Sequence, residues 1–273
     1  MRPKKRWGQH FLTRPEIGVQ VAEFAAIKPA DIVVEIGAGT GILTEELAKR
    51  AKKVVAFEID PDLIPALRER FSAAPNVEIV VGDFLKIGPE RLKKLEKFKV
   101  VANIPYYLTT PLIFLLLDFI PGMETMVLTI QREVAERLAA KPDTREYGAL
   151  TLSVGILARV ELVKIIKKGA FRPPPKVESA VVRISPHLKP LLEPAEAQAF
   201  SKLVHSVFGQ RRKTILNQLA KYLDISKIRT GEILAESGID PIRRPETLSL
   251  EEYIQLTKTT AERREGTQPL PYI

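Results

Sequence analysis

The sequence predicts an α/β protein with an open parallel β-sheet flanked by helices, followed by a small all-helical domain. Three observations predict this fold. A buried-type strand runs directly into a glycine-rich turn and a helix, three further apolar strands end in polar residues, and a proline-rich segment at residues 186–194 precedes a purely helical pattern. We therefore expect one domain at residues 1–186 and a second at residues 187–273.

Composition narrows the class of protein. The chain has 273 residues, enough for a large and a small domain. It contains no cysteine, which excludes disulfides, thiolate metal sites and cysteine nucleophiles. Its three histidines are far apart in the sequence, and its longest apolar run is shorter than the roughly 20 residues of a membrane-spanning helix. We expect a cytoplasmic, monomeric protein without a bound metal or a membrane partner.

The net charge of +9 favours a polyanionic partner such as a nucleic acid. Basic residues without intervening acids gather at residues 1–15 and again at residues 205–222. Both segments are candidates for contacts with phosphates. The alternative is a solvated chain end for the first segment and a solvated surface for the second. The candidate phosphate contacts are Lys4, Lys5, Arg6, Arg211, Arg212 and Lys213.

The basic N-terminal arm ends in aromatic residues that are expected to dock on the body of the protein, and a helix follows at residues 16–27. The first strand, at residues 31–36, leads into Gly37-Ala38-Gly39-Thr40-Gly41 and a helix at residues 42–51. Glycines allow a sharp turn and a close approach of the backbone to a ligand, so Gly37 and Gly39 are candidate ligand contacts. The spacing differs from that of dinucleotide-binding enzymes, and the Lys-Ser/Thr pair of a phosphate-binding loop is missing.

The next two strands, at residues 53–60 and 77–81, also end in acidic residues. Glu58 would accept hydrogen bonds from two ribose hydroxyls, and Asp60 would alternatively cap the helix that follows. Asp83 would accept from an adenine amine or cap a turn. The carboxyl ends of parallel strands meet at one edge of a sheet, so these side chains are expected to line one nucleotide site.

A fourth strand at residues 99–102 brings Asn103-Ile104-Pro105-Tyr106 to the same edge. Asn103 offers a side-chain acceptor, Pro105 a carbonyl outside any ladder, and Tyr106 a flat ring. These groups suit a planar amino group such as the exocyclic amine of adenine, although a plain strand-to-helix loop is the alternative. Thr110 is expected to cap the next helix.

The remaining segments complete the sheet and the helical domain. A loop with three consecutive prolines begins at Phe171, which would stack on a base opposite Tyr106 or serve as a hydrophobic plug. An antiparallel pair of strands flanks this loop. Strands are expected at residues 125–131, 160–168 and 179–184, and helices at residues 112–119, 132–139, 149–157, 195–208, 212–223, 228–236 and 249–262.

Five segments together resemble one known family. The loop from Glu35 to Gly41 resembles the cofactor loop of S-adenosylmethionine-dependent methyltransferases, and residues 103–106 resemble the signature of enzymes that modify adenine N6. With residues 8–12, 171–179 and 207–213, the match covers nearly the whole chain and resembles the ribosomal RNA adenine dimethyltransferases, in particular the bacterial small-subunit branch.

The resemblance implies a Rossmann-like methyltransferase sheet and the cofactor S-adenosyl-L-methionine. It also implies a substrate, two adjacent adenosines in a hairpin loop near the 3′ end of small-subunit (16S) ribosomal RNA, which are dimethylated at N6 in the immature small ribosomal subunit. Position 10 is Asn in some members and His here. The implied cofactor contacts are His10, Leu12, Gly37, Gly39, Glu58, Asp83 and Asn103, and the implied catalytic residues are Asn103, Pro105, Tyr106 and Phe171.

We expect direct transfer of the methyl group, without a metal or a covalent enzyme intermediate, through positioning and electrostatics. Three alternatives stay open at this stage. They are methylation of large-subunit RNA as in the macrolide-resistance enzymes, methylation of DNA adenine, and a non-catalytic RNA-binding role in assembly or transcription on the same fold.

Overall fold

Seven strands form the main β-sheet of this computed structural model, in the order β4-β3-β2-β5-β6-β9-β7. The structure describes residue 4 and residues 7–120, 122–210 and 212–265. The strands are β2 (Ile32–Ile36), β3 (Lys53–Glu58), β4 (Val77–Val81), β5 (Phe98–Asn103), β6 (Met123–Gln131), β7 (Ala158–Ile166) and β9 (Ser179–Pro186).

The sheet is parallel from β4 to β6, and β9 runs antiparallel to β6. The chain builds outward from β2 to β3 and β4, and then returns to place β5 on the other side of β2. The strand order therefore reverses between β2 and β5, which is where ligands bind in open α/β sheets. The glycine loop after β2 and the loop after β5 lie next to each other at this point.

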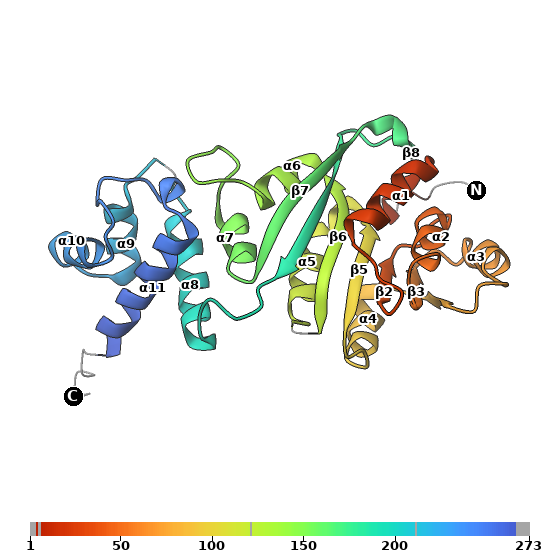
Figure 1. Cartoon of the computed structure of the whole chain (residues 1–273). Coiled ribbons are helices and arrows are strands. Elements are labelled where there is room, and N and C mark those ends of the chain that lie inside the picture. Colours follow the sequence, from red (N-terminus) through yellow and green to blue (C-terminus); the bar gives the residue numbers. More distant parts are fainter. Residues whose placement is uncertain (1–3, 5–6, 121, 211, 266–273) are drawn as a thin grey trace. The chain divides into compact units, whose positions relative to one another are not determined.

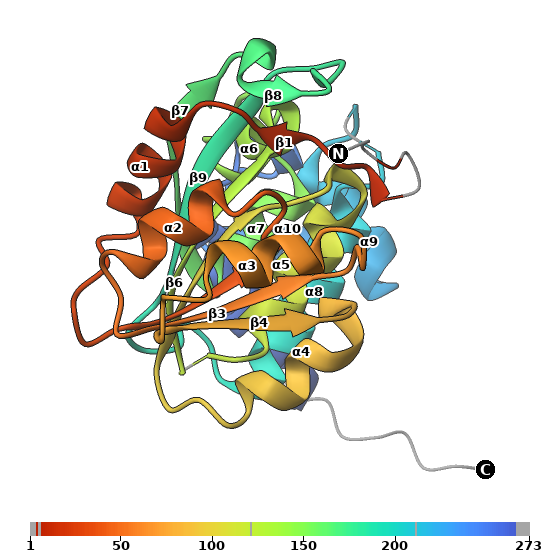
Figure 2. The ribbon, with the colours of Figure 1, turned by 90° about the vertical axis from the view of Figure 1, so that its right-hand side faces the viewer.

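Helices cover both faces of the sheet. Figure 2 shows β3 and β4 side by side, with α3 on one side of them and α4 on the other. The central strands are fully buried, as Val33, Val54 and Val101 illustrate, and this explains why they read as continuous apolar runs. The helices before and between these strands are α1 (Pro15–Phe24), α2 (Ile42–Ala48), α3 (Ile64–Arg70), α4 (Phe84–Leu92) and α5 (Thr109–Leu117), and α6 (Arg132–Leu138) follows β6 directly.

A second, two-stranded sheet joins the N-terminal arm to the proline loop. Strand β1 (Phe11–Leu12) runs antiparallel to β8 (Phe171–Arg172), and Leu12 pairs with Phe171. Figure 2 shows β1 and β8 close together although they are far apart in the sequence, and Figure 1 shows α1, the helix that follows β1, beside β8. The arm is therefore part of the fold.

The C-terminal region is helical, with a core of its own around Phe200, Leu219 and Tyr253, all of which are buried. The Tyr253 hydroxyl donates a hydrogen bond to the Pro245 carbonyl at 2.9 Å, so this buried polar group is satisfied. The helices are α7 (Ala149–Gly155), α8 (Pro194–Val207), α9 (Ile215–Leu223), α10 (Lys227–Glu236) and α11 (Leu250–Glu265).

The predicted division into two domains at residue 186 is wrong for one segment of the chain. The chain forms two compact units, residues 1–135 with 159–186, and residues 136–158 with 187–273. Residues 136–158 join the second unit because Tyr147, Leu152 and Ile156 belong to its hydrophobic core. No local sequence signal shows which of two cores a helix will join.

The start of α5 also differs from expectation. The helix begins at Thr109 directly after a short 3-10 turn at Tyr106–Leu108, so Thr110 is not its cap. Pro111 lies in the first turn of α5, where a backbone N–H would have no acceptor within the helix, so the proline costs no hydrogen bond. Within the described residues, no helix is both long enough and apolar enough to cross a membrane.

Candidate active site

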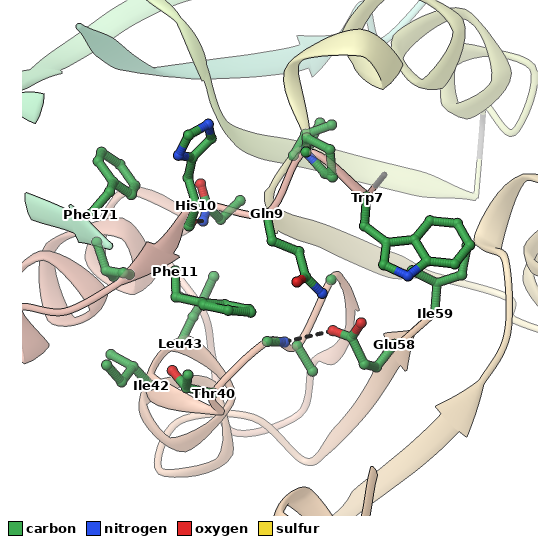
Figure 3. Close-up of a pocket in the computed structure, with 18 of the residues that line it drawn as sticks. Trp7, Gln9, His10, Phe11, Thr40, Ile42, Leu43, Glu58, Ile59 and Phe171 are labelled. Atoms are coloured by element: carbon green, nitrogen blue, oxygen red, sulfur yellow. Dashed lines mark hydrogen bonds between the residues drawn. The ribbon is translucent and has the colours of Figure 1, made fainter. Parts of the chain in front are cut away.

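A cavity opens at the carboxyl edge of the sheet, where β2, β3 and β5 end. Its lining comes from the N-terminal arm, the glycine loop, the end of β3, the loop after β5 and Phe171. Figure 3 shows Trp7 and Ile59 at one end of this cavity and Phe171 at the other. We call it the first cavity. It brings together every segment in which the sequence predicts contacts with the cofactor or the target base, except the one at Asp83.

The glycine loop is fixed by hydrogen bonds to β3. The backbone N–H groups of Gly37 and Ala38 both donate to the Phe57 carbonyl, and the N–H of Gly39 donates to Glu58 Oε2 at 2.8 Å (Figure 3). Gly39 has a φ of +58°, in the left-handed region that favours glycine. A Cβ atom at Gly39 would lie only 3.2 Å from the Phe11 ring, so the loop also needs glycine for the close approach of the arm.

Glu58 is buried, and each of its oxygens already accepts one backbone hydrogen bond. Oε2 accepts from Gly39 and Oε1 accepts from the N–H of Asp60 at 2.8 Å. Burial raises the pKa of Glu58, and these backbone donors oppose the rise. A carboxylate oxygen has a second lone pair, so Glu58 retains the capacity to accept hydroxyl hydrogens from a ligand in the cavity.

Glu35 is a second buried acid in the lining, to which the sequence analysis assigned no separate role. It is 1% exposed, and neither of its oxygens has a hydrogen bond of normal geometry among the described residues, although the Thr44 hydroxyl lies nearby. Burial raises the pKa of Glu35 to about 8, helped by the charge of Glu58 and opposed by Thr44. The signal in the sequence is an acid inside an otherwise apolar strand.

Asp83 lies in a neighbouring cavity, the second cavity, with Ile59, Phe84 and Leu85. Its carboxylate accepts from the Leu85 N–H at 3.0 Å and so caps α4, as the alternative interpretation of this residue held. Phe84 is buried against Phe57, with the ring centroids 4.9 Å apart in an edge-on arrangement. Both cavities share Trp7, Gly37, Ile59, Ile104 and Pro105, so they are parts of one cleft.

Asn103 stands at the end of β5 beside the glycine loop. A Cβ atom at Gly37 would lie 3.6 Å from the Asn103 carbonyl oxygen. The side-chain Nδ2 of Asn103 donates to the His10 carbonyl at 3.0 Å, while Oδ1 of the same amide is a hydrogen-bond acceptor. The Pro105 carbonyl accepts from the Leu108 N–H at 2.9 Å, which leaves one lone pair for a ligand.

Tyr106 lines both the first cavity and a third, larger one that also contains Gln131, Pro173 and Val177. The ring of Tyr106 is half-buried and stacks on the His10 imidazole, with centroids 5.5 Å apart and planes inclined by 27°. Its hydroxyl lies 2.9 Å from Ser179 Oγ. Burial raises the pKa of Tyr106, and the hydrogen bond with Ser179 opposes the rise.

The N-terminal arm is held over the cleft by an ion-pair network. Lys4 Nζ lies 2.6 Å from Asp60 Oδ1 and 2.5 Å from Asp62 Oδ2, and Gln9 donates to Asp60 Oδ2 at 2.9 Å. Asp60 also accepts from the Asp62 N–H at 3.2 Å, but it does not cap a helix, because α3 begins only at Ile64, after Leu63. The charge of Lys4 is thus engaged within the chain, which differs from the phosphate contact that the sequence predicts. No local pattern in the sequence indicates that Lys4 and Asp60 form an ion pair.

Leu12, Phe171 and His10 are predicted site residues whose side-chain contacts the structure defines. Leu12 and Phe171 pair between β1 and β8 and line the first cavity, and Phe171 is only 4% exposed. The structure therefore gives Phe171 the position of the hydrophobic plug, with an edge on the cavity. The His10 side chain points to the proline loop, where Nδ1 lies 2.7 Å from the Pro173 carbonyl, and only its backbone reaches Asn103.

The basic candidates outside the arm lie in the second unit. Arg212 and Lys213 are exposed and precede α9, which begins at Ile215, three residues later than expected. Lys5, Arg6 and Arg211 lie outside the described residues. In the part of the chain that the structure describes, no group of three His, Asp or Glu side chains is arranged to hold a metal ion.

Comparisons with known proteins show the family of this chain. The family model for ribosomal RNA adenine dimethylase matches residues 1–259. The protein named ribosomal RNA small subunit methyltransferase A of Anoxybacillus flavithermus is 44% identical over 264 residues, covering 93% of this chain and 89% of that protein. The protein of the same name from Dehalococcoides mccartyi (strain BAV1) is 43% identical and covers 94% of this chain and 88% of its own length.

Solved structures show the same fold. A dimethyladenosine transferase from Plasmodium falciparum superposes with a TM-score of 0.81 at 28% identity, covering 93% of this chain and 98% of that one. The 23S rRNA methyltransferase ErmE has a TM-score of 0.74 at 31% identity, covering 91% and 98%. The match of the family model over most of the chain, together with relatives above 40% identity, shows that this chain belongs to the ribosomal RNA adenine dimethylase family.

Proposed function

We propose that the chain is an S-adenosyl-L-methionine-dependent enzyme that dimethylates N6 of two adjacent adenosines in small-subunit (16S) ribosomal RNA. The two adenosines lie in a hairpin loop near the 3′ end, and the reaction takes place in the cytoplasm during biogenesis of the small subunit. The observation that carries this proposal is that Asn103 lines the glycine-loop cavity and that Tyr106 lines both this cavity and the third one.

The first and second cavities fit the cofactor. A nucleoside with an amino-acid tail carries ribose hydroxyls, an adenine amine and an ammonium group. Glu58 has acceptor capacity for the hydroxyls and Asp83 lies in the adjoining cavity, while the buried Glu35 carboxyl gains a favourable partner in a cation. When bound, the cofactor supplies a methyl group on a sulfonium that is already an activated leaving group.

The chain's own residues orient the acceptor amine. Asn103 Oδ1 and the free lone pair of the Pro105 carbonyl would accept the two N6 hydrogens and stabilise the positive charge that develops on nitrogen. The ring of Tyr106 would stack on the base, worth about 1–3 kcal/mol by analogy with proteins that bind single strands. An adenosine in a loop is already partly unstacked, which lowers the cost of bringing it into the site.

Phosphate contacts are expected from both units. The exposed Arg212 and Lys213 suit this role. Lys5, Arg6 and Arg211 remain proposals from the sequence. Because Lys4 is paired with two acids, we assign it to holding the arm.

The test is transfer of labelled methyl groups from S-adenosylmethionine to immature small ribosomal subunits, followed by nucleoside analysis. N6,N6-dimethyladenosine in small-subunit RNA would support the proposal. Asn103→Ala should abolish the label. Asn217→Ala, which removes an amide bonded only to Thr214 among the described residues, should not.

Two other results would replace the proposal. Label in large-subunit RNA would favour the activity named for ErmE, whose structure is also similar. Binding of RNA and cofactor without any label would favour a non-catalytic role in assembly.

A further inference from the structure

Ser179 is a buried polar residue whose role the reaction does not explain. It is 0% exposed, and its Oγ has a single hydrogen bond within the described part of the chain, to the Tyr106 hydroxyl at 2.9 Å. It is the last residue of the segment that begins at Phe171 and carries the three prolines. A buried hydroxyl without this partner would be unsatisfied, so the two groups depend on each other.

The backbone around Ser179 is rigid. Ser179 opens β9 and pairs directly with Gln131, the last residue of β6. The preceding residue, Glu178, accepts from the Arg132 N–H at 3.0 Å through its carbonyl and forms an ion pair with the Arg132 side chain at 2.8 Å. The Ser179 hydroxyl therefore stands at a fixed point beside the site.

Tyr106, in contrast, has less backbone support. It lies in a short 3-10 turn outside the sheet, and its ring is half-buried and stacks on the His10 imidazole. A ring held at its backbone alone would rotate about its side-chain bonds. Hydrogen bonding at the far end of the ring, to a group on a different strand, fixes the plane of the ring.

We propose that Ser179 is a positioning residue that fixes the plane of the Tyr106 ring for stacking on the target adenine. The proposal rests on the proposed function and deepens it, because it concerns alignment of the base with the acceptors at Asn103 and Pro105. Since the rest of the interface holds the RNA, misalignment of one base lowers kcat more than it raises KM.

The test compares Ser179→Ala, Tyr106→Phe and the double variant. A neutral hydrogen bond of ordinary strength predicts a roughly three- to tenfold fall in kcat at saturating RNA and cofactor for either single variant. The double variant should be no slower than Tyr106→Phe alone, since both changes remove one interaction. Ser185→Ala is the matched control, because Ser185 lies on the same strand with its hydroxyl 3.4 Å from Thr125.

A local probe separates positioning from general destabilisation. RNA with 2-aminopurine at the target position should be quenched by stacking in the wild-type complex and less quenched with Ser179→Ala, while calorimetric affinity for S-adenosylmethionine stays unchanged. If Ser179→Ala does not fold, Ser179→Cys keeps the size of the side chain with a weaker donor and should give an intermediate kcat.

Several results would overturn the proposal. They are a wild-type kcat for Ser179→Ala, losses that add fully in the double variant, and a loss of cofactor affinity parallel to the loss of kcat. Failure of the wild-type protein itself to methylate any RNA would instead refute the proposed function, so the two failures are distinguishable.

Discussion

The buried Glu35 predicts that the protein without cofactor loses stability as pH rises. Its pKa is about 8 in the folded chain and 4.5 as the ordinary value. The folded state therefore binds this proton more tightly than the unfolded state does. Its contribution to the free energy of unfolding is fully present below about pH 4.5 and is lost progressively as pH rises to about 8.

The size of the effect follows from the same two values. The difference between them corresponds to roughly 5 kcal/mol in total, of which about 3 kcal/mol is lost between about pH 5.5 and pH 9. Acids with a lowered pKa, such as Asp60 and Glu45, lose their contributions only below that range. The raised pKa of Glu58 also lowers stability as pH rises, so a variant of Glu35 is needed to measure the contribution of Glu35 alone.

Urea unfolding of the cofactor-free protein at about pH 5.5, 7 and 9 measures how the free energy of unfolding changes with pH. Wild type should lose about 3 kcal/mol more than Glu35→Gln across this range, because glutamine cannot ionise. Glu78→Gln changes an acid with a lowered pKa at the edge of the sheet and should parallel the wild type. Parallel curves for wild type and Glu35→Gln, within about 0.5 kcal/mol, would refute the reasoning, since they would show that Glu35 ionises at its ordinary pKa.

Three further changes test the cleft. Glu58→Gln leaves one backbone N–H of Gly39 or Asp60 without an acceptor, and an unsatisfied buried donor costs about 1–3 kcal/mol. The affinity for S-adenosylmethionine, measured by calorimetry, should therefore fall roughly 5- to 150-fold. An unchanged affinity would contradict this prediction. In Gly39→Ala, the alanine must adopt a left-handed φ, which costs about 1–2 kcal/mol, and its Cβ must displace the Phe11 ring. The affinity for the cofactor should therefore fall by roughly tenfold or more. A wild-type affinity would show that the loop adapts to the substitution. Tyr106→Ala removes a stack of about 1–3 kcal/mol and should lower kcat/KM for RNA roughly 5- to 150-fold while cofactor affinity survives. Equal losses in both measurements would mean that Tyr106 supports the fold instead.

The sequence predicted the sheet well because each strand carries its own local signal. The strand at residues 77–81 has the predicted bounds, and the others differ by only a few residues at either end. Buried parallel strands are continuous apolar runs, and the polar residues that follow them are displayed at one edge whatever the details of packing. For this reason Gly37, Glu58 and Asn103 could be placed together before any coordinates.

Contacts between distant segments could not be read in the same way. The pairing of Lys4 with Asp60, the antiparallel pairing of Leu12 with Phe171 and the bond between Tyr106 and Ser179 each join residues more than fifty positions apart. Nothing in the local pattern of a lysine in a basic arm distinguishes a phosphate contact from an internal ion pair. The same limit applies to α7, whose Leu152 joins the core of the second unit together with Ile156, the residue after the helix.

The sequence by itself thus determined the fold class, the edge of the sheet that carries the site and the type of ligand groups there, because the strands, the residues at their ends and the chemistry of those residues follow from local periodicity and motif. Only the tertiary structure decided which of those groups are free to act. It buried Phe171, paired Lys4, left Glu35 in the cleft without a hydrogen bond of normal geometry among the described residues, and tied Tyr106 to Ser179. The physical reason is that burial and hydrogen-bond partners depend on the neighbours that folding brings together across the chain.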